Sequence, residues 1–159
     1  PRLVSFNGRS FDLAVLKYRA MKYEIAAPFL YKSGDKWNSY TSRYSLDWHC
    51  DLLEALRDFG ASGAVRLNEV CAILNLPGKV DVDGSSVSDL FDAGKVGEIR
   101  DYCETDCLNT YLLYLRYALH TGLTSKSAYE KSVEQIQTYL HENTDKEHLN
   151  KFLTAWEEA

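Results

Sequence analysis

The sequence LVSFNGRSFD, residues 3–12, decides the fold at the start of this chain. The apolar run Leu3–Phe6 predicts a short buried strand. The pair Asn7–Gly8 predicts the turn that ends the strand, because glycine adopts backbone angles that other residues avoid. Residues 11–23 then predict a helix with Ser10 as its N-cap. A strand, a turn and a helix form half of a βα unit, so polar side chains of this stretch lie where the strand meets the helix.

Helical periodicity predicts most of the remaining elements. Helices are expected over residues 51–59, 67–76, 86–93, 95–120, 125–141 and 145–158. Residues 24–46 lack this periodicity, and residues 79–84 are expected to form a polar loop. A second short strand is expected at the end of residues 44–50.

Length and charge exclude several classes of protein. A chain of 159 residues favours one domain, and no apolar run approaches the ~20 residues that cross a bilayer. The net charge is −5, but residues 1–50 carry +4 and the remainder carries −9. A uniformly basic nucleic-acid binder is therefore excluded, whereas a protein with one basic edge is not.

The four cysteines do not form a recognisable metal or disulfide pattern. They lie at positions 50, 71, 103 and 107, and no pair has the two-residue spacing of a zinc site. We expect them to be small buried apolar residues. The absence of a disulfide framework and of an export signal predicts a reducing, cytoplasmic location.

Two carboxylates stand out as candidates for chemistry. At about 100° per residue, the predicted long helix places Asp106 among mainly apolar neighbours and Glu104 roughly 160° away. Tyr102, four residues before Asp106, lies on the same face. A carboxylate that points toward apolar groups needs a partner, a proton or a cation. Asp12 occupies the first turn of its helix, where the helix dipole favours an acid. If the two acids converge, Mg²⁺ or Mn²⁺ between them would offset their repulsion.

Several stretches resemble one enzyme family. FNGRSFD, residues 6–12, resembles the second exonuclease motif of the proofreading domain of family B DNA polymerases, and YCETD, residues 102–106, resembles the third. HCDLLEAL at residues 49–56 and the segment 83–116 are similar to the predicted 3′-to-5′ exonuclease family related to that domain. The resemblance covers residues 2 to about 120, with the motifs in the family's order.

This resemblance implies an α/β, RNase H-like fold, with a mixed sheet flanked by helices, and two-metal hydrolysis of phosphodiester bonds at the 3′ end of single-stranded DNA. It implies that Asp12 and Asp106 bind Mg²⁺ or Mn²⁺ and that Tyr102 orients the attacking water. It implies that Asn7 and Phe11 contact the terminal nucleotides, by a hydrogen bond and by packing on a base. Residues 1–122 would then be the C-terminal part of an exonuclease domain, and residues 123–159 a helical extension packed on it or extending from it.

The chain departs from the family pattern in one respect. The family's first motif, Asp-x-Glu, belongs on a strand before FNGRSFD, and only six residues precede Asn7. The sequence Asp145–Glu147 has the right letters but lies in a polar helical segment, so we reject it. We therefore expect the first strands to be missing and helix to predominate. The missing strands would come from a preceding segment or a second chain, and self-association into a homo-oligomer is a further possibility. This fragment alone would then be inactive.

Each candidate residue also has an ordinary structural interpretation. Asp12 could serve the helix dipole alone, Asn7 could be a turn residue, and Phe11 and Tyr102 could be core residues. Asp51 is expected to cap its helix, and His49 to be structural. The segment 23–48 interleaves seven aromatic residues with basic ones, which suits either single-stranded DNA or a cover over the sheet edge.

Two alternative functions stay open. The first is a non-catalytic RNase H-like module that binds nucleic acid or protein. The second is a mainly helical interaction domain whose motif matches arise by chance. Convergence of Asp12 and Asp106 within bridging distance of one or two metals would separate the exonuclease from the second alternative.

Overall fold

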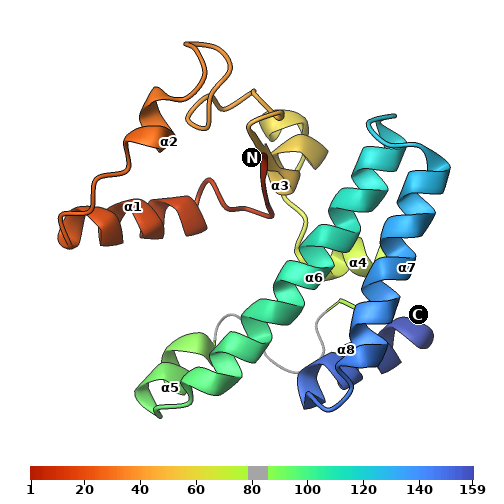
Figure 1. Ribbon diagram of the computed structural model, residues 1–159. Coiled ribbons are helices and arrows are strands. Elements are labelled where there is room, and N and C mark those ends of the chain that lie inside the picture. The colour runs from red at the N-terminus through yellow and green to blue at the C-terminus, as the bar shows by residue number, and fades with distance from the viewer. Residues whose placement is uncertain (79–85) are drawn as a thin grey trace. The chain divides into compact units, whose positions relative to one another are not determined.

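A computed structural model describes residues 1–78 and 86–159 and divides the chain into two compact units, residues 1–65 and 66–159 (Figure 1). The predicted loop at residues 79–84 lies outside the described residues. The described part is mostly helical, with a two-stranded parallel sheet, which agrees with a partial α/β fold. The division that we predict at residue 122 is a functional one and stays a prediction.

The first unit is built on its parallel strand pair. Strands β1 (Leu3–Ser5) and β2 (His49–Asp51) pair in parallel, with Val4 opposite Cys50. Parallel strands require a crossover connection, and helices α1 (Asp12–Lys22) and α2 (Pro28–Lys32) lie within it. The unit continues into α3 (Leu52–Leu56) and the 3₁₀ turn η1 (Asp58–Gly60). All three residues of β2 are buried, so the core of this unit centres on the second strand.

The crossover segment is held to the strands by one buried aromatic residue. Tyr40 is 5% exposed and makes edge contacts with Phe29 and Trp48, at ring-centroid distances of 5.8 and 5.0 Å. Its hydroxyl donates a hydrogen bond to the carbonyl oxygen of Pro1. Tyr40 thus packs next to residues that adjoin the strands, but five other aromatic residues of the segment are exposed: Tyr23, Phe29, Tyr31, Trp37 and Tyr44. The segment as a whole therefore does not form the predicted cover over the sheet edge.

Three sequence predictions in this unit need correction. Residues 24–46 were expected without helix, but Pro28 begins α2, since proline is pre-organised for the first helical turn. The predicted N-cap Ser10 is wrong: Phe11 occupies that position without a side-chain cap. Backbone bonds take the cap's place, because the amide of Phe11 donates to Asn7 and that of Leu13 to Gly8. The helix predicted over residues 51–59 is divided into α3 and η1.

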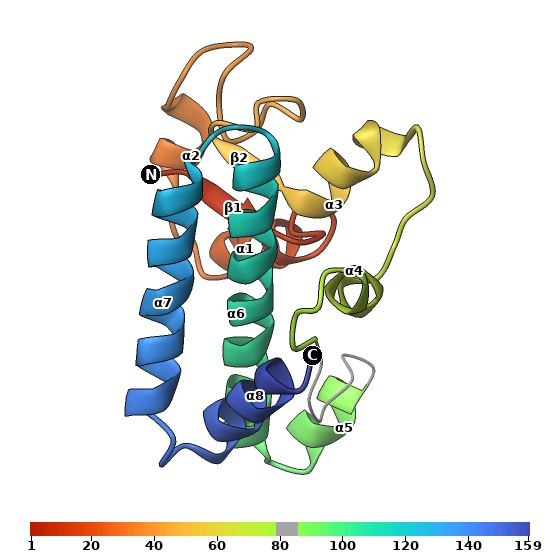
Figure 2. The same cartoon turned by 90° about the vertical axis from the view of Figure 1, so that its right-hand side faces the viewer.

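The second unit is a helical bundle around one long helix. Its elements are α4 (Leu67–Ile73), α5 (Val87–Asp92), α6 (Val96–His120), α7 (Lys126–Glu142) and α8 (Glu147–Glu157). Helix α7 runs alongside α6, and α8 packs against both (Figure 2). Most of the buried apolar side chains come from these three helices: Leu112, Leu113, Leu115, Ala118, Ile136, Leu140, Leu149, Phe152 and Leu153. Cys71 of α4 and Leu76 after it complete the core. No helix in the described ranges combines the length and apolar character needed to cross a membrane.

The cysteines divide into two kinds. Cys50 and Cys71 are buried, as predicted, and burial raises the pKa of each thiol to about 11. Cys103 and Cys107 are exposed, so the prediction of burial is wrong for this pair. Both lie in the part of α6 before Leu112, where only Thr105 and Asn109 are buried.

A buried asparagine ties α6 to the end of α4. Asn109 is 1% exposed. Its Nδ2 donates to the carbonyl oxygen of Gly78 at 2.7 Å, and its Oδ1 accepts from the amide of Gly78 at 3.1 Å. Gly78 itself is buried and has φ +67°, a left-handed conformation that favours glycine. One side chain thus satisfies both backbone groups of a buried turn.

We expect Asn109→Leu to destabilise the second unit by about 1–3 kcal/mol for each polar group of Gly78 left buried and unpaired. Leucine has a similar size but offers neither a donor nor an acceptor. Urea unfolding followed by circular dichroism would measure the change. The matched control, Asn150→Leu on the exposed side of α8, should change stability by less than about 0.5 kcal/mol. Equal effects of the two substitutions would contradict the role given to Asn109.

Candidate active site

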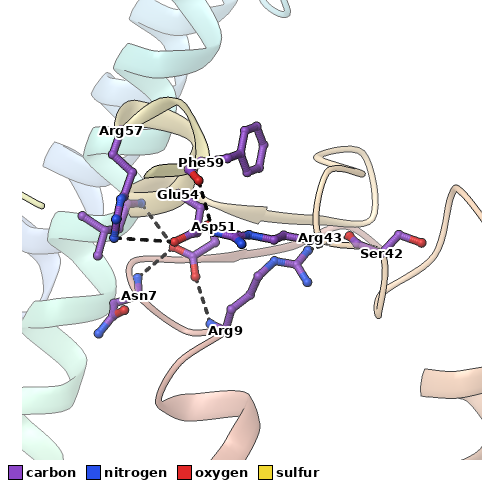
Figure 3. Close-up of polar contacts among 9 residues, drawn as sticks. Asn7, Arg9, Ser42, Arg43, Asp51, Glu54, Arg57 and Phe59 are labelled. Atoms are coloured by element: carbon purple, nitrogen blue, oxygen red, sulfur yellow. Dashed lines mark hydrogen bonds and ion pairs between the residues drawn. The ribbon is translucent and has the colours of Figure 1, made fainter. Parts of the chain in front are cut away.

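The turn after β1 is held by the carboxylate of Asp51 (Figure 3). Oδ1 accepts the backbone amide of Asn7 at 2.9 Å, and Oδ2 accepts that of Arg9, also at 2.9 Å. Oδ1 also accepts the amide of Leu53 at 3.2 Å, so Asp51 caps α3 as predicted. Asp51 is 1% exposed. A buried carboxylate is stable when several amides donate to it, and here those donors fix the backbone of the predicted motif.

The same turn depends on close packing at Gly8. A Cβ atom at Gly8 would lie 2.4 Å from Oγ of Ser5 and 3.4 Å from Oδ2 of Asp12. The first distance leaves no room for any other residue. Asn7 has φ +65°, in the left-handed region that asparagine tolerates better than most residues. The structure thus confirms the predicted turn but not its predicted reason: the left-handed residue is Asn7, and Gly8 is required by close packing and not by its backbone freedom.

The turn leaves three predicted site residues open to solvent. Asn7 and Asp12 are exposed, and Phe11 is 65% exposed. The alternative that Phe11 is a core residue is therefore wrong. Asp12 lies in the first turn of α1, where the helix dipole favours its charge. These three side chains share one short, fixed piece of backbone.

His49 supports the strand pair from within the core. It is fully buried, and its Nε2 lies 2.8 Å from Oγ of Ser5. Burial, and to a smaller extent the nearby charge of Arg9, lower the pKa of His49 to about 4. A histidine that is neutral and enclosed in this way fits the predicted structural role.

The other predicted residues lie in the second unit, on α6. Tyr102 and Asp106 are one turn apart and both are half-buried. The expectation that Asp106 points into an apolar layer is only partly met, because Cys103 on the same face is exposed. Asp12 belongs to residues 1–65 and Asp106 to residues 66–159. Each acid is placed within its own unit, and their convergence stays a prediction.

Glu104 has a role that the sequence did not reveal. Its Oε1 accepts the hydroxyl of Tyr139 on α7, and its Oε2 lies 2.9 Å from Nε2 of His148 on α8. The hydrogen bond with His148 lowers the pKa of Glu104, and the hydrogen bond from Tyr139 adds to this effect. Glu104, which the sequence placed on the side of α6 away from Asp106, thus joins three helices. Its partners are 35 and 44 residues away, so helical periodicity alone offers no signal for them.

The oxygen donors at the predicted site fit a divalent cation in kind. Carboxylates are the ligands that Mg²⁺ and Mn²⁺ prefer, and Asp12 is accessible to solvent. Within residues 1–78 and 86–159, however, no group of three or more His, Cys, Asp or Glu side chains could hold a metal ion. The described residues therefore supply suitable ligands without completing a metal site.

Residues 1–156 match a protein family described as predicted 3′-5′ exonuclease related to the exonuclease domain of PolB. The chain belongs to this family. The membership spans nearly the whole chain, including α7 and α8, whereas the resemblance seen in the sequence ended near residue 120. No curated protein matches the chain. Among solved structures there is also no match.

The structure places the rejected acidic stretch, Asp145–Glu147, and the predicted metal ligand Asp12 in different settings. The stretch Asp145–Glu147, rejected as the family's first motif, lies at a turn and the start of α8. It is not on a strand in the described structure. Asp12 follows directly after the turn that ends β1. The placement of these acids therefore agrees with the choice made from the sequence.

We expect Asp51→Asn to loosen the turn at residues 7–9. An amide has one oxygen, so it cannot accept from both Asn7 and Arg9 while also capping α3. Each hydrogen bond to a charged group contributes roughly 1.5–3 kcal/mol, and the loss should appear in urea unfolding followed by tryptophan fluorescence. Amide exchange at residues 7 and 9 should become faster. The control Asp47→Asn removes a carboxylate that is 82% exposed and should cost at most about 1 kcal/mol.

We expect the first unit to lose stability in mild acid because of His49. The pKa of His49 is about 4 in the folded chain and about 6.5 when unfolded. The unfolded chain therefore binds a proton first, and the free energy of unfolding falls as the pH drops from about 6.5 to 4. Thermal melts across this range would measure the slope. His49→Gln should reduce it, whereas His141→Gln, at an exposed position on α7, should not. An unchanged slope in His49→Gln would contradict this account.

Proposed function

We propose that this chain forms part of a metal-dependent 3′-5′ exonuclease that hydrolyses phosphodiester bonds at single-stranded DNA ends. Family membership supports the reaction class. The observation that carries the proposal is the turn held by Asp51, which presents Asn7, Phe11 and Asp12 together on a fixed backbone. Catalysis depends on such positioning, because small displacements of reacting groups are costly.

The proposed roles divide between the two units. Asp12 and Asp106 are the carboxylates that would hold Mg²⁺ or Mn²⁺. Bound divalent cations of this kind generate hydroxide near neutral pH and stabilise the leaving oxygen. Tyr102, one turn before Asp106 on α6, would orient the attacking water through its hydroxyl.

Two exposed residues would contact the 3′-terminal nucleotides. Asn7 has both donor and acceptor atoms on its side chain, and it is exposed to solvent. Phe11 is 65% exposed and offers an aromatic face on which a base can stack, a contact that tolerates any base. Family membership implies a nucleic-acid substrate, and these contacts support single strands.

We also propose that strands carrying the Asp-x-Glu motif complete the sheet. Two three-residue strands rarely form a stable sheet alone. Helix α1 buries none of its side chains. Its exposed large apolar residues are Val15, Leu16, Tyr18 and Met21. Strands from a preceding segment or a second chain would cover some of these residues and supply the remaining metal ligands, so we expect the 159-residue chain alone to be inactive.

One observation favours a second candidate function, binding without cleavage. The part of the chain that the structure describes contains no cluster of three potential metal ligands. A module that binds nucleic acid or protein through the same exposed residues needs no such cluster. DNA binding without turnover, even with the Asp-x-Glu strand supplied, would establish this alternative.

The exonuclease is tested by digestion of a 5′-labelled single-stranded DNA with Mg²⁺ or Mn²⁺. We expect no cleavage by the 159-residue chain alone. A ladder that shortens from the 3′ end should appear when a segment carrying the Asp-x-Glu strand is joined before Pro1. In that extended protein, Asp12→Asn and Asp106→Asn should each reduce the rate by at least about 10²-fold, because each removes a metal ligand.

The matched controls are Asp145→Asn and Glu147→Gln. They change acids of the rejected motif at the start of α8 and should leave the cleavage rate within about twofold of the parent. Cleavage that persists in Asp12→Asn would refute the assignment of the site. Equal losses in the control variants would show that the effect is not specific to Asp12 and Asp106.

A further inference from the structure

The first unit contains a hollow of about 330 Å³ beside the predicted motif. It lies among side chains of α1, α3 and the segment between the strands: Arg9, Ser10, Leu13, Lys17, Tyr40, Thr41, Arg43 and Glu54. Ser10 and Leu13 flank Phe11 and Asp12 in the sequence. The hollow is therefore a separate feature that adjoins the residues already assigned.

The lining of the hollow is positively charged. Three of its side chains are cations, Arg9, Lys17 and Arg43, and one is a carboxylate, Glu54. Two lining residues, Ser10 and Thr41, have hydroxyl groups that donate hydrogen bonds. A concave site with excess positive charge and several donors is suited to an anion. All lining residues except Glu54 belong to the basic part of the chain, because residues 1–50 carry a net charge of +4.

Two of the cations are held in place by protein groups. Nη2 of Arg9 donates to the carbonyl oxygens of Ser42 and His49 at 3.0 and 3.3 Å. Nε of Arg43 donates to Oε2 of Glu54 at 2.9 Å (Figure 3). Ordered guanidinium groups lose little conformational entropy when an anion binds.

Lys17 is a cation of the hollow whose charge is not neutralised by an ion pair within the described residues. It is half-buried on α1. No ion pair joins it to an acid of residues 1–78 or 86–159. A lysine that lines a hollow without a carboxylate partner gains most from an anionic ligand, because ligand binding does not first break an existing pair.

An aromatic surface adjoins the hollow. Tyr44, next to Arg43 in the chain, is 70% exposed, and its ring makes an edge contact with Phe59 at 4.8 Å. The guanidinium of Arg43 lies 5.9 Å from the centroid of the same ring. Basic groups that bind phosphates, beside aromatic rings that stack on bases, are typical of single-strand binding sites.

We infer that this hollow binds a backbone phosphate of single-stranded nucleic acid, with Lys17 as its principal charged contact and Tyr44 as an adjacent stacking surface. The inference rests on the proposed function in one respect, the direction of the bound strand. The hollow lies beside the residues that would hold the 3′ end, so the strand would run from there into the hollow. It adds a phosphate contact that uses none of the proposed metal ligands. Substrate would then bind in the absence of metal.

The test is fluorescence anisotropy of a 5′-labelled twelve-residue oligothymidylate with the full 159-residue chain in EDTA. Lys17→Gln should weaken binding three- to tenfold. It should also reduce the slope of log K against log salt by about 0.7, the value for one phosphate contact on a single strand. Tyr44→Ala should weaken binding without changing this slope. Circular dichroism would verify that each variant is folded.

The matched control is Lys22→Gln. Lys22 lies on the same helix, is exposed and does not line the hollow. Lys22→Gln removes the same charge as Lys17→Gln, but at a position outside the hollow. Binding by this variant should therefore stay within twofold of the parent. Equal weakening by both variants would indicate general electrostatic attraction and overturn the inference, as would absence of oligonucleotide binding by the folded parent chain.

Competition with inorganic phosphate distinguishes a site for the backbone phosphate of nucleic acid from a site for free phosphate. If millimolar phosphate displaces the oligonucleotide only weakly, the strand is the ligand. If phosphate alone binds, with an affinity that depends on Lys17 and equals that of the oligonucleotide, the nucleic-acid assignment is wrong. These measurements use no metal and no cleavage. A failed exonuclease assay with intact Lys17-dependent binding would refute the proposed function alone, and the reverse result would refute this inference alone.

Discussion

The fold of the first unit depends on one buried carboxylate. Asp51 comes from the end of β2, yet two of its three backbone partners belong to the turn after β1. The strands pair over only three residues, so their ladder is short. The carboxylate extends this pairing beyond the last strand residue and converts the strand end into a fixed turn. The conformation of Asn7 and the start of α1 follow from that constraint.

The sequence predicts local features of this region well and long-range ones poorly. Leu3–Phe6 predicted β1, Asn7–Gly8 predicted its turn, and Asp51 was expected to cap its own helix. The structure confirms these three elements, but β1 is half-buried and not buried as predicted. The bonds from Asp51 to residues 7 and 9 span 44 and 42 positions. Periodicity and capping rules describe neighbours in the chain, so they carry no information about such bonds.

The second unit shows the same limit in a different form. Helix α6 was predicted nearly to the residue, because its periodic pattern is long. The exposure of its faces was harder to predict, since α4, α7 and α8 all pack on it. Asn109 is buried by a turn that follows α4, and Glu104 is engaged by α7 and α8. A helical wheel predicts burial by assuming that one side of the helix is apolar and buried. This assumption fails for α6, because other helices contact it from several directions.

Helix α1 has a thermodynamic consequence for the acid at its start. It is 11 residues long and buries none of them, whereas isolated helices shorter than about 12–15 residues are marginal in water. Its later turns can therefore open without disrupting the core, as a local fluctuation of low free energy. Asp12 is spared much of this motion, because the first turn is bonded to Asn7 and Gly8. The first unit thus holds Asp12, a proposed metal ligand, in a fixed turn, while the later turns of the same helix can unfold locally at a low cost in free energy.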